Sequence, residues 1–211
     1  MTTSANPASA WRDDVRLMFA PGATYRRLLQ GPLPTGWRAL LTRPAQVALV
    51  LAGFVSLTNT GGFFPSLLLG SLVAWSWVPA LQMAIATPLI VAARALTRQR
   101  SLRLSSCIDL FFAGHAPWSL WLLIAAVVMT ANLPEPLLHN VRRILLTGLV
   151  PILWTWVLTF SFGRTVLALP GWLAALGTLL YQAAIWTCAY FYVGAVTHRL
   201  WPFALYPSFL G

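Results

Sequence analysis

The sequence predicts an all-α fold: a polytopic membrane helix bundle of five transmembrane helices, preceded by short interfacial amphipathic helices. Hydrophobic residues make up 58% of the chain and charged residues only 9%, whereas an ordinary soluble domain has about 25% charged residues. About 20 uncharged apolar residues span the hydrocarbon core of a bilayer. The chain contains several such segments, at residues 44–93, 110–134, 144–163 and 165–198.

Residues 1–43 are predicted to form a cytoplasmic segment that carries two amphipathic helices. Trp11, Val15 and Met18 share one face of the first helix, and charged residues occupy the other face. Pro21-Gly22 ends this helix, and residues 23–30 form the second. Basic flanks and aromatic anchors suit helices that lie in the membrane interface. The alternative is that both helices simply cap the bundle.

The five spans follow from the breaks between the uncharged segments. A single helix over residues 44–93 would be about 75 Å long at 1.5 Å per residue, so the chain must reverse at Gly61 to Pro65. Pro79 and Pro88 are expected to kink the second span. The predicted spans are 44–64, 68–93, 109–136, 144–169 and 172–196. They form a membrane domain at residues 44–197, followed by an apolar interfacial tail at 198–211.

The arginines predict the orientation of the chain. All 14 basic residues are arginine, and the formal net charge is +10. With the amino terminus inside, only Arg142, Arg143 and Arg199 face outward, as the positive-inside rule requires. Such a charge balance suits an anionic membrane surface, and nucleic acid is not expected as a partner. The compact loops and arginine-only basic set favour a bacterial inner (cytoplasmic) membrane, with a multi-pass chain and a cytoplasmic amino terminus.

Two segments resemble a known family. The first is residues 15–29, where Pro21 and then Tyr25 follow an apolar patch; the second is residues 111–120, which contain Pro117. Both segments resemble the Yip family, the Ypt/Rab-interacting proteins and their bacterial relatives. The resemblance implies a five-helix bundle with a cytoplasmic amino terminus and roles exerted through partner proteins. Eukaryotic members usually carry a longer cytosolic amino-terminal region than this chain, which argues against a small-GTPase partner.

Ionisable residues at membrane depth are costly, and they are therefore candidate functional residues. Asp109 is expected at the inner end of the third span, and Arg164 about one turn above the inner end of the fourth. Their opposite charges and matched depth predict an ion pair that fixes the register of the two helices. In the alternative interpretation, Arg164 reaches the headgroups and Asp109 caps its helix near Arg103.

His115 and Asn59 are the other polar candidates. His115 is expected to bond to a neighbouring helix, beside the carbonyl groups that Pro117 leaves free. Asn59 belongs to a polar group with Ser56, Thr58 and Thr60 near the outer end of the first span. These side chains either line a polar cleft or bond between helices.

No catalytic, metal or phosphate-binding motif occurs in the sequence, and Cys107 and Cys188 lack the spacing of a metal site. We therefore expect no enzyme activity and no cofactor. The 11 tryptophans offer large rigid surfaces for packing. These features predict a non-enzymatic membrane scaffold or accessory subunit that packs against lipids, other integral membrane proteins or a larger membrane complex. The alternative is a small transporter or channel that uses the polar residues of the third and fourth spans.

Overall fold

The structure is a computed structural model that describes residues 7–60, 64–98, 101–131 and 137–196. The described chain is almost entirely helical and contains no strand, which confirms the all-α prediction for these residues. Its helices are α1 (Pro7–Phe19), α2 (Pro21–Gln30), α3 (Gly36–Thr60), α4 (Pro65–Trp75), α5 (Trp77–Thr97), α6 (Leu104–Ala113), α7 (Ala116–Ala131), α8 (Leu137–Thr165) and α9 (Gly171–Val196).

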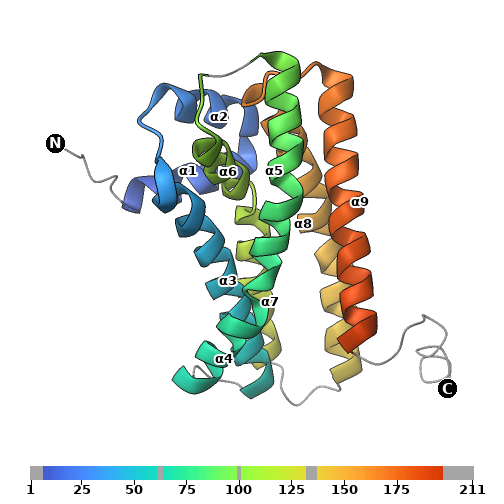
Figure 1. Ribbon diagram of the computed structural model, residues 1–211. Coiled ribbons are helices and arrows are strands. Elements are labelled where there is room, and N and C mark those ends of the chain that lie inside the picture. The colour runs from blue at the N-terminus through green and yellow to red at the C-terminus, as the bar shows by residue number, and fades with distance from the viewer. Residues whose placement is uncertain (1–6, 61–63, 99–100, 132–136, 197–211) are drawn as a thin grey trace.

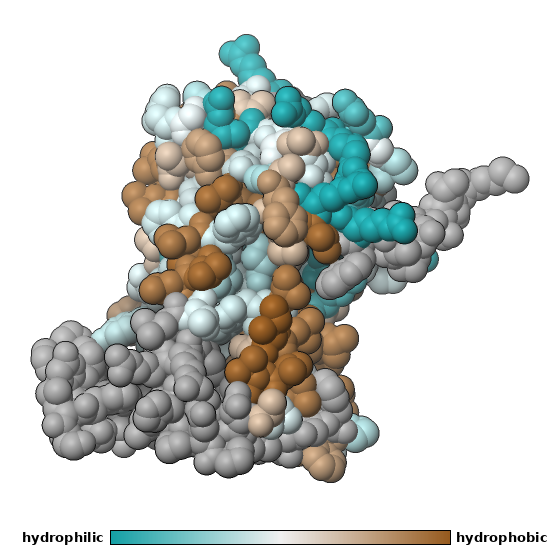
Figure 2. Space-filling model, turned by 180° about the vertical axis from the view of Figure 1, so that it is seen from behind, coloured by the Kyte–Doolittle hydropathy of each residue, from teal (hydrophilic) through white to brown (hydrophobic). Residues whose placement is uncertain are grey.

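The long helices α3, α5, α7, α8 and α9 run along one axis of the molecule, and the short helices α1, α2 and α6 gather at one end (Figure 1). We call this end the polar end. Figure 2 shows hydrophilic side chains collected there, whereas hydrophobic side chains predominate farther along the same face. The bundle therefore separates a charged end from an apolar body, as a membrane protein requires.

Four segments of the described chain are long and apolar enough to cross a membrane: Gly36–Leu57, Pro65–Thr97, Leu104–Val128 and Gly171–Phe191. By length and composition, the chain is a multi-pass membrane protein. The helix α8 is not among these segments, although it packs between α7 and α9. Four of the five predicted spans coincide with these candidate segments, and the predicted fourth span, over α8, stays a prediction.

The first span begins earlier than predicted. The sequence placed its start at Pro44, after the charge of Arg43, but α3 begins at Gly36 and includes both residues. Pro44 lacks a backbone N–H group and so removes one helical hydrogen bond, yet the helix continues through it. The helix can retain Arg43 because carboxylates on other helices contact this guanidinium group.

The second span consists of two helices. We expected kinks at Pro79 and Pro88, but the break falls at Ser76, between α4 and α5. Pro79 lies in the first turn of α5, where its missing N–H group costs little, and its ring disfavours a continuous helix through the preceding turn. Pro88 lies inside α5, which continues to Thr97.

The third span also differs from the single helix that the sequence predicted from Asp109 onward. It begins at Leu104 and is interrupted at Gly114 and His115, which separate α6 from α7. Pro117 occupies the first turn of α7, where its ring suits the start of a helix. The proline therefore starts a new helix and does not bend a continuous one.

The amino-terminal helices pack into the polar end of the bundle. Leu17 on α1 and Tyr25 on α2 are completely buried, and α2 packs against α8. The indole N–H of Trp154 on α8 donates to the carbonyl oxygen of Met18 at 2.8 Å. As predicted, a break separates the two helices, with Pro21 in the first turn of α2. These contacts agree with the cap interpretation, and a position in the membrane interface stays a prediction.

The last two helices pack closely through a glycine. α9 runs from Gly171 to Val196, one residue earlier at its start than predicted, and α8 begins at Leu137 instead of residue 144. A Cβ atom at Gly163 of α8 would lie 3.2 Å from the Cβ atom of Ala174 on α9. The turn predicted at residues 132–136 and the apolar tail at 198–211 lie outside the described residues.

We expect Gly163→Val to lower the free energy of unfolding by about 1–3 kcal/mol, the usual cost of overpacking. The valine side chain would press on Ala174, so the two helices must separate. Gly70→Val on α4 is the matched control, because a Cβ atom at Gly70 meets no atom within 4 Å. Thermal unfolding in detergent measures both variants. Equal unfolding temperatures for the two would contradict the close α8–α9 contact.

Candidate functional site

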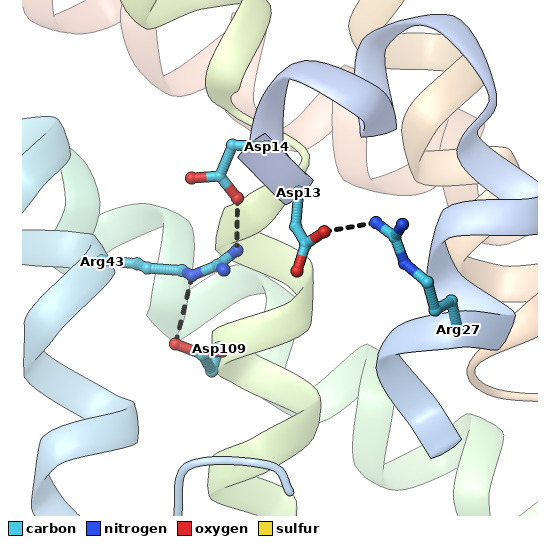
Figure 3. A network of polar contacts seen from close by, with 5 residues as sticks. All are labelled: Asp13, Asp14, Arg27, Arg43 and Asp109. Atoms are coloured by element: carbon cyan, nitrogen blue, oxygen red, sulfur yellow. Dashed lines mark hydrogen bonds and ion pairs between the residues drawn. The ribbon is translucent and has the colours of Figure 1, made fainter. Parts of the chain in front are cut away.

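All three acidic residues of the described chain contact arginines at the polar end. Figure 3 shows two groups of charges there, one around Arg43 and one that joins Asp13 to Arg27. The charges come from α1, α2, α3 and α6, so they connect four helices that are separate in the sequence. We call the residues Asp14, Arg43 and Asp109 the charge cluster.

Arg43 is at the centre of the charge cluster and extends from α3 between two carboxylates (Figure 3). Its Nη1 lies 3.2 Å from Oδ1 of Asp14 on α1, and its Nε lies 3.4 Å from Oδ1 of Asp109 on α6. The side chains of Arg43 and Asp109 are only 13% and 6% exposed. A single guanidinium group thus joins three helices through charges that are largely shielded from solvent.

The Asp14 contact is an ion pair without an aligned hydrogen bond. Asp14 Oδ1 and Arg43 Nη1 are buried, and neither forms a hydrogen bond within the described chain. Burial raises the pKa of Asp14, Arg43 lowers it, and the nearby carboxylates of Asp109 and Asp13 raise it, so that together they move it from 3.8 to about 6. Asp14 and Asp109 therefore share the single positive charge of Arg43, and the carboxylate of Asp14 readily accepts a proton.

The second ion pair holds the two amino-terminal helices together. Arg27 Nη2 on α2 donates to Oδ1 of Asp13 on α1. The Arg27 side chain is 44% exposed, and exposed pairs contribute about 0–1 kcal/mol. We therefore attribute the placement of α1 mainly to the charge cluster and to the buried Leu17.

Three hydrogen bonds hold the start of α6 in place. Ser106 Oγ donates to the carbonyl oxygen of Pro34 at 2.8 Å, and the Gly36 N–H donates to Ser105 Oγ at 3.3 Å. Arg94 Nη2 on α5 donates to the carbonyl oxygen of Leu102. These contacts fix α6 against the beginning of α3, and this position brings Asp109 to Arg43.

The predicted Asp109–Arg164 ion pair is wrong. Asp109 contacts Arg43, and Arg164 Nη1 donates to the carbonyl oxygen of Leu169 at 2.8 Å. Arg164 is exposed at the end of α8 and binds the connection to α9. The carboxylate of Asp109 on α6 points toward Arg43 on α3 instead of toward α8 (Figure 3). The alternative of an Asp109 cap near Arg103 also fails, because no side chain caps the start of α6.

His115 lies in a buried aromatic cluster at the break between α6 and α7. It is 5% exposed, and its ring stacks on Phe112 at 5.1 Å between centroids. Phe111 contacts the rings of His115, Phe162 and Tyr181 edge to face. Nδ1 of His115 forms no hydrogen bond within the described chain, so this atom does not confirm the predicted bond to a neighbouring helix. The contacts with Phe111 and Phe112 hold the ring in place.

Tyr25 fills the space that the break creates. Its hydroxyl oxygen lies 3.2 Å from the position that a Cβ atom of Gly114 would occupy, and its ring contacts Phe162 at 5.9 Å. Burial raises the pKa of Tyr25, so the phenol stays protonated. The hydroxyl has no hydrogen-bond partner within the described chain. Only a glycine at position 114 gives the tyrosine this close an approach to the backbone.

The remaining candidates do not join these groups. Ser56 is buried, at 2% exposure, and the side chains of Thr58 and Asn59 lie outside the described part of the structure. No ion pair or hydrogen bond joins Asp109, His115 and Arg164 to one another in the described chain. In the same residues, no three His, Cys, Asp or Glu side chains gather as metal ligands would.

Sequence reasoning missed Arg43 as the shared partner of Asp14 and Asp109. Arg43 was assigned to the cytoplasmic flank of the first span, and Asp14 to the polar face of an amphipathic helix. A signal was present, because Asp13 and Asp14 are two of only four acidic residues in a chain with 14 arginines. Such scarce carboxylates are expected to neutralise the arginines that are hardest to solvate.

We expect Arg43→Met to lower the free energy of unfolding by about 3 kcal/mol, because it leaves two buried carboxylates without a cation. Arg12→Met, at an exposed position of α1, is the control and should change stability by no more than about 0.5 kcal/mol. Unfolding in detergent measures both. Adding Asp109→Asn to Arg43→Met should recover part of the loss. Equal stability of the two single variants would contradict the role of the charge cluster.

The raised pKa of Asp14 predicts a pH dependence. The folded state binds the proton more tightly than the unfolded state, with a folded pKa of about 6 against 3.8. Protonation of Asp14 therefore stabilises the folded state fully below its unfolded pKa of 3.8, and this stabilisation is lost as the pH rises through the folded pKa of about 6. Between about pH 4 and pH 7, unfolding measurements should show a stability decrease that Asp14→Asn reduces. An identical slope for this variant and the wild type would contradict the assignment.

Comparisons of the chain with models of known families, with curated protein sequences and with solved structures each found no match. The resemblance to the Yip family, drawn from the segments around Pro21, Tyr25 and Pro117, stays a prediction. We therefore infer function from the geometry of the described residues.

Proposed function

We propose that this protein is a non-enzymatic membrane scaffold or accessory subunit, which packs against other integral membrane proteins or lipids. The observation that carries the proposal is the contrast between its charged and apolar surfaces. The charge cluster is buried and engaged in holding α1, α3 and α6 together. Large apolar side chains, by contrast, face outward along the long helices. The chain thus uses its acidic residues for its own assembly and presents hydrophobic surface along its long helices.

The outward surface of α8 is the broadest example. Leu149, Leu153 and Val157 are 54%, 66% and 52% exposed, and they follow one another at helical spacing. Trp154 and Trp156 are also exposed on this helix. Rigid aromatic side chains beside an aliphatic row are typical of surfaces that pack against another apolar surface. We propose that α8 completes a set of five spans and offers this surface inside the membrane.

The proposal also includes the orientation of the chain in the membrane. The polar end carries α1, α2 and most of the arginines of the described chain, and the positive-inside rule favours the cytoplasmic side for such an end. We therefore place the amino terminus in the cytoplasm and the protein in a bacterial inner membrane. The alternative of a transporter or channel draws less support, because Asp109, His115 and Arg164 have three different surroundings.

Photo-crosslinking in intact membranes tests the scaffold proposal. A photoreactive phenylalanine analogue is introduced in place of Val157, which faces outward, or in place of the adjacent Leu158, which is 1% exposed. We expect position 157 to crosslink to one membrane protein in stoichiometric yield and position 158 to crosslink only within the chain. Mass spectrometry identifies the products.

Flux measurements in liposomes test the alternative function, a transporter or channel. The purified protein is placed in liposomes, and ion and solute flux is recorded for the wild type and for a variant with Asp109, His115 and Arg164 replaced together. We expect no flux from the wild type. A monomer that yields no intermolecular crosslink at position 157 but carries a solute, and loses this flux in the triple variant, would overturn the scaffold proposal in favour of the transporter.

A further inference from the structure

Two hollows lie one below the other along the seam between α5 and α9. The upper hollow, of about 50 Å³, is lined by residues of α5, α6, α8 and α9, among them Ala93, Phe162 and Gly177. The lower hollow, of about 190 Å³, is lined by Val78, Ala189 and other residues of α3, α4, α5 and α9, which are apolar or tryptophan except for Gln82. Both hollows have residues of α5 and α9 in their walls, so they follow one seam between these two helices. We call it the α5–α9 seam.

The seam is long enough to hold a lipid chain. Val78 and Ala93 are fifteen positions apart on α5, which corresponds to about 22 Å at 1.5 Å per residue. One leaflet of a bilayer is about 15 Å of hydrocarbon, half of the total thickness of about 30 Å. The threonine hydroxyls of the upper hollow donate to carbonyl groups of their own helices. The wall is therefore mainly apolar, and a hydrocarbon chain fits its chemistry.

Arginines without carboxylate partners lie at the upper end of the seam. Arg94 follows Ala93 directly, Arg98 ends α5, and Arg164 follows Gly163, which also lines the upper hollow. None of the three forms an ion pair in the described chain, although Arg94 and Arg164 each donate one hydrogen bond to a backbone carbonyl oxygen, that of Leu102 and that of Leu169. Arg98 and Arg164 are exposed. A phosphate group is the natural partner for arginines in this position.

We propose that the α5–α9 seam binds one anionic phospholipid, with an acyl chain in the hollows and its phosphate at Arg94, Arg98 and Arg164. The hydrocarbon chain replaces contacts that an empty hollow would lose. The arginines supply the preference for an anionic headgroup. A zwitterionic lipid fills the hollows equally well but balances less of the positive charge. This site is independent of the partner surface on α8.

Native mass spectrometry of the purified full-length protein tests the proposal. After lipid removal, the protein is titrated with phosphatidylglycerol or with phosphatidylcholine of the same acyl chains. We expect the wild type to retain one phosphatidylglycerol molecule, at an at least tenfold lower concentration than it needs for phosphatidylcholine. Gly177→Leu fills the upper hollow, since a Cβ atom there meets no protein atom within 4 Å, and should reduce retention at least fivefold.

Gly70→Leu is the matched control, because its site is equally open and does not line either hollow. It should retain lipid as the wild type does. Replacing Arg98 and Arg164 by glutamine should remove the preference for phosphatidylglycerol. An eight-carbon phosphatidylglycerol, tested on the wild type, should be retained more weakly than the long-chain lipid, whether or not the variants fold. Equal retention of both headgroups by the wild type, or of both chain lengths, would overturn the proposal.

Discussion

The rest of the structure depends on the neutralisation of Arg43 inside an apolar bundle. A guanidinium group shielded from water is stable only beside negative charge, and here the carboxylates come from α1 and α6. This requirement helps to fix α1 and α6 at the polar end, together with the buried apolar side chains of both helices. The charge cluster also consumes most of the acidic residues of the described chain. As a result, the other arginines at the polar end remain available to the membrane.

The aromatic cluster depends on the same placement. Pro117 favours a new helix start, and the resulting break at Gly114 and His115 opens a space in the bundle. Tyr25 reaches this space because the charge cluster and Leu17 hold the preceding helix against the bundle. Electrostatic and packing contacts therefore reinforce one another at the polar end. Both depend on residues near the amino terminus, which a hydropathy plot would treat as peripheral.

Local sequence features predicted where the helices lie better than they predicted where the helices end or which side chains contact one another. The breaks at Pro21 and Pro65 and the extent of α9 follow from proline positions and uncharged length, and the structure agrees. The start of α3 could not be predicted in this way, because it depends on carboxylates distant in the sequence. The partner of Asp109 was missed for a related reason. Matched depth left several arginines possible, and only the orientation of α6 selects Arg43.

The break at Ser76 adjusts the length of the second span to the bilayer. The segment Pro65–Thr97 has 33 residues and would measure about 50 Å as one straight helix, against about 30 Å of hydrocarbon. Figure 1 shows α4 at an angle to α5, beside the end of α3. The bend brings excess apolar length back toward the bundle, where a straight helix would distort the surrounding lipid. A single residue, Ser76, thus lets 33 mainly apolar residues occupy a hydrocarbon layer that a straight helix of this length would exceed.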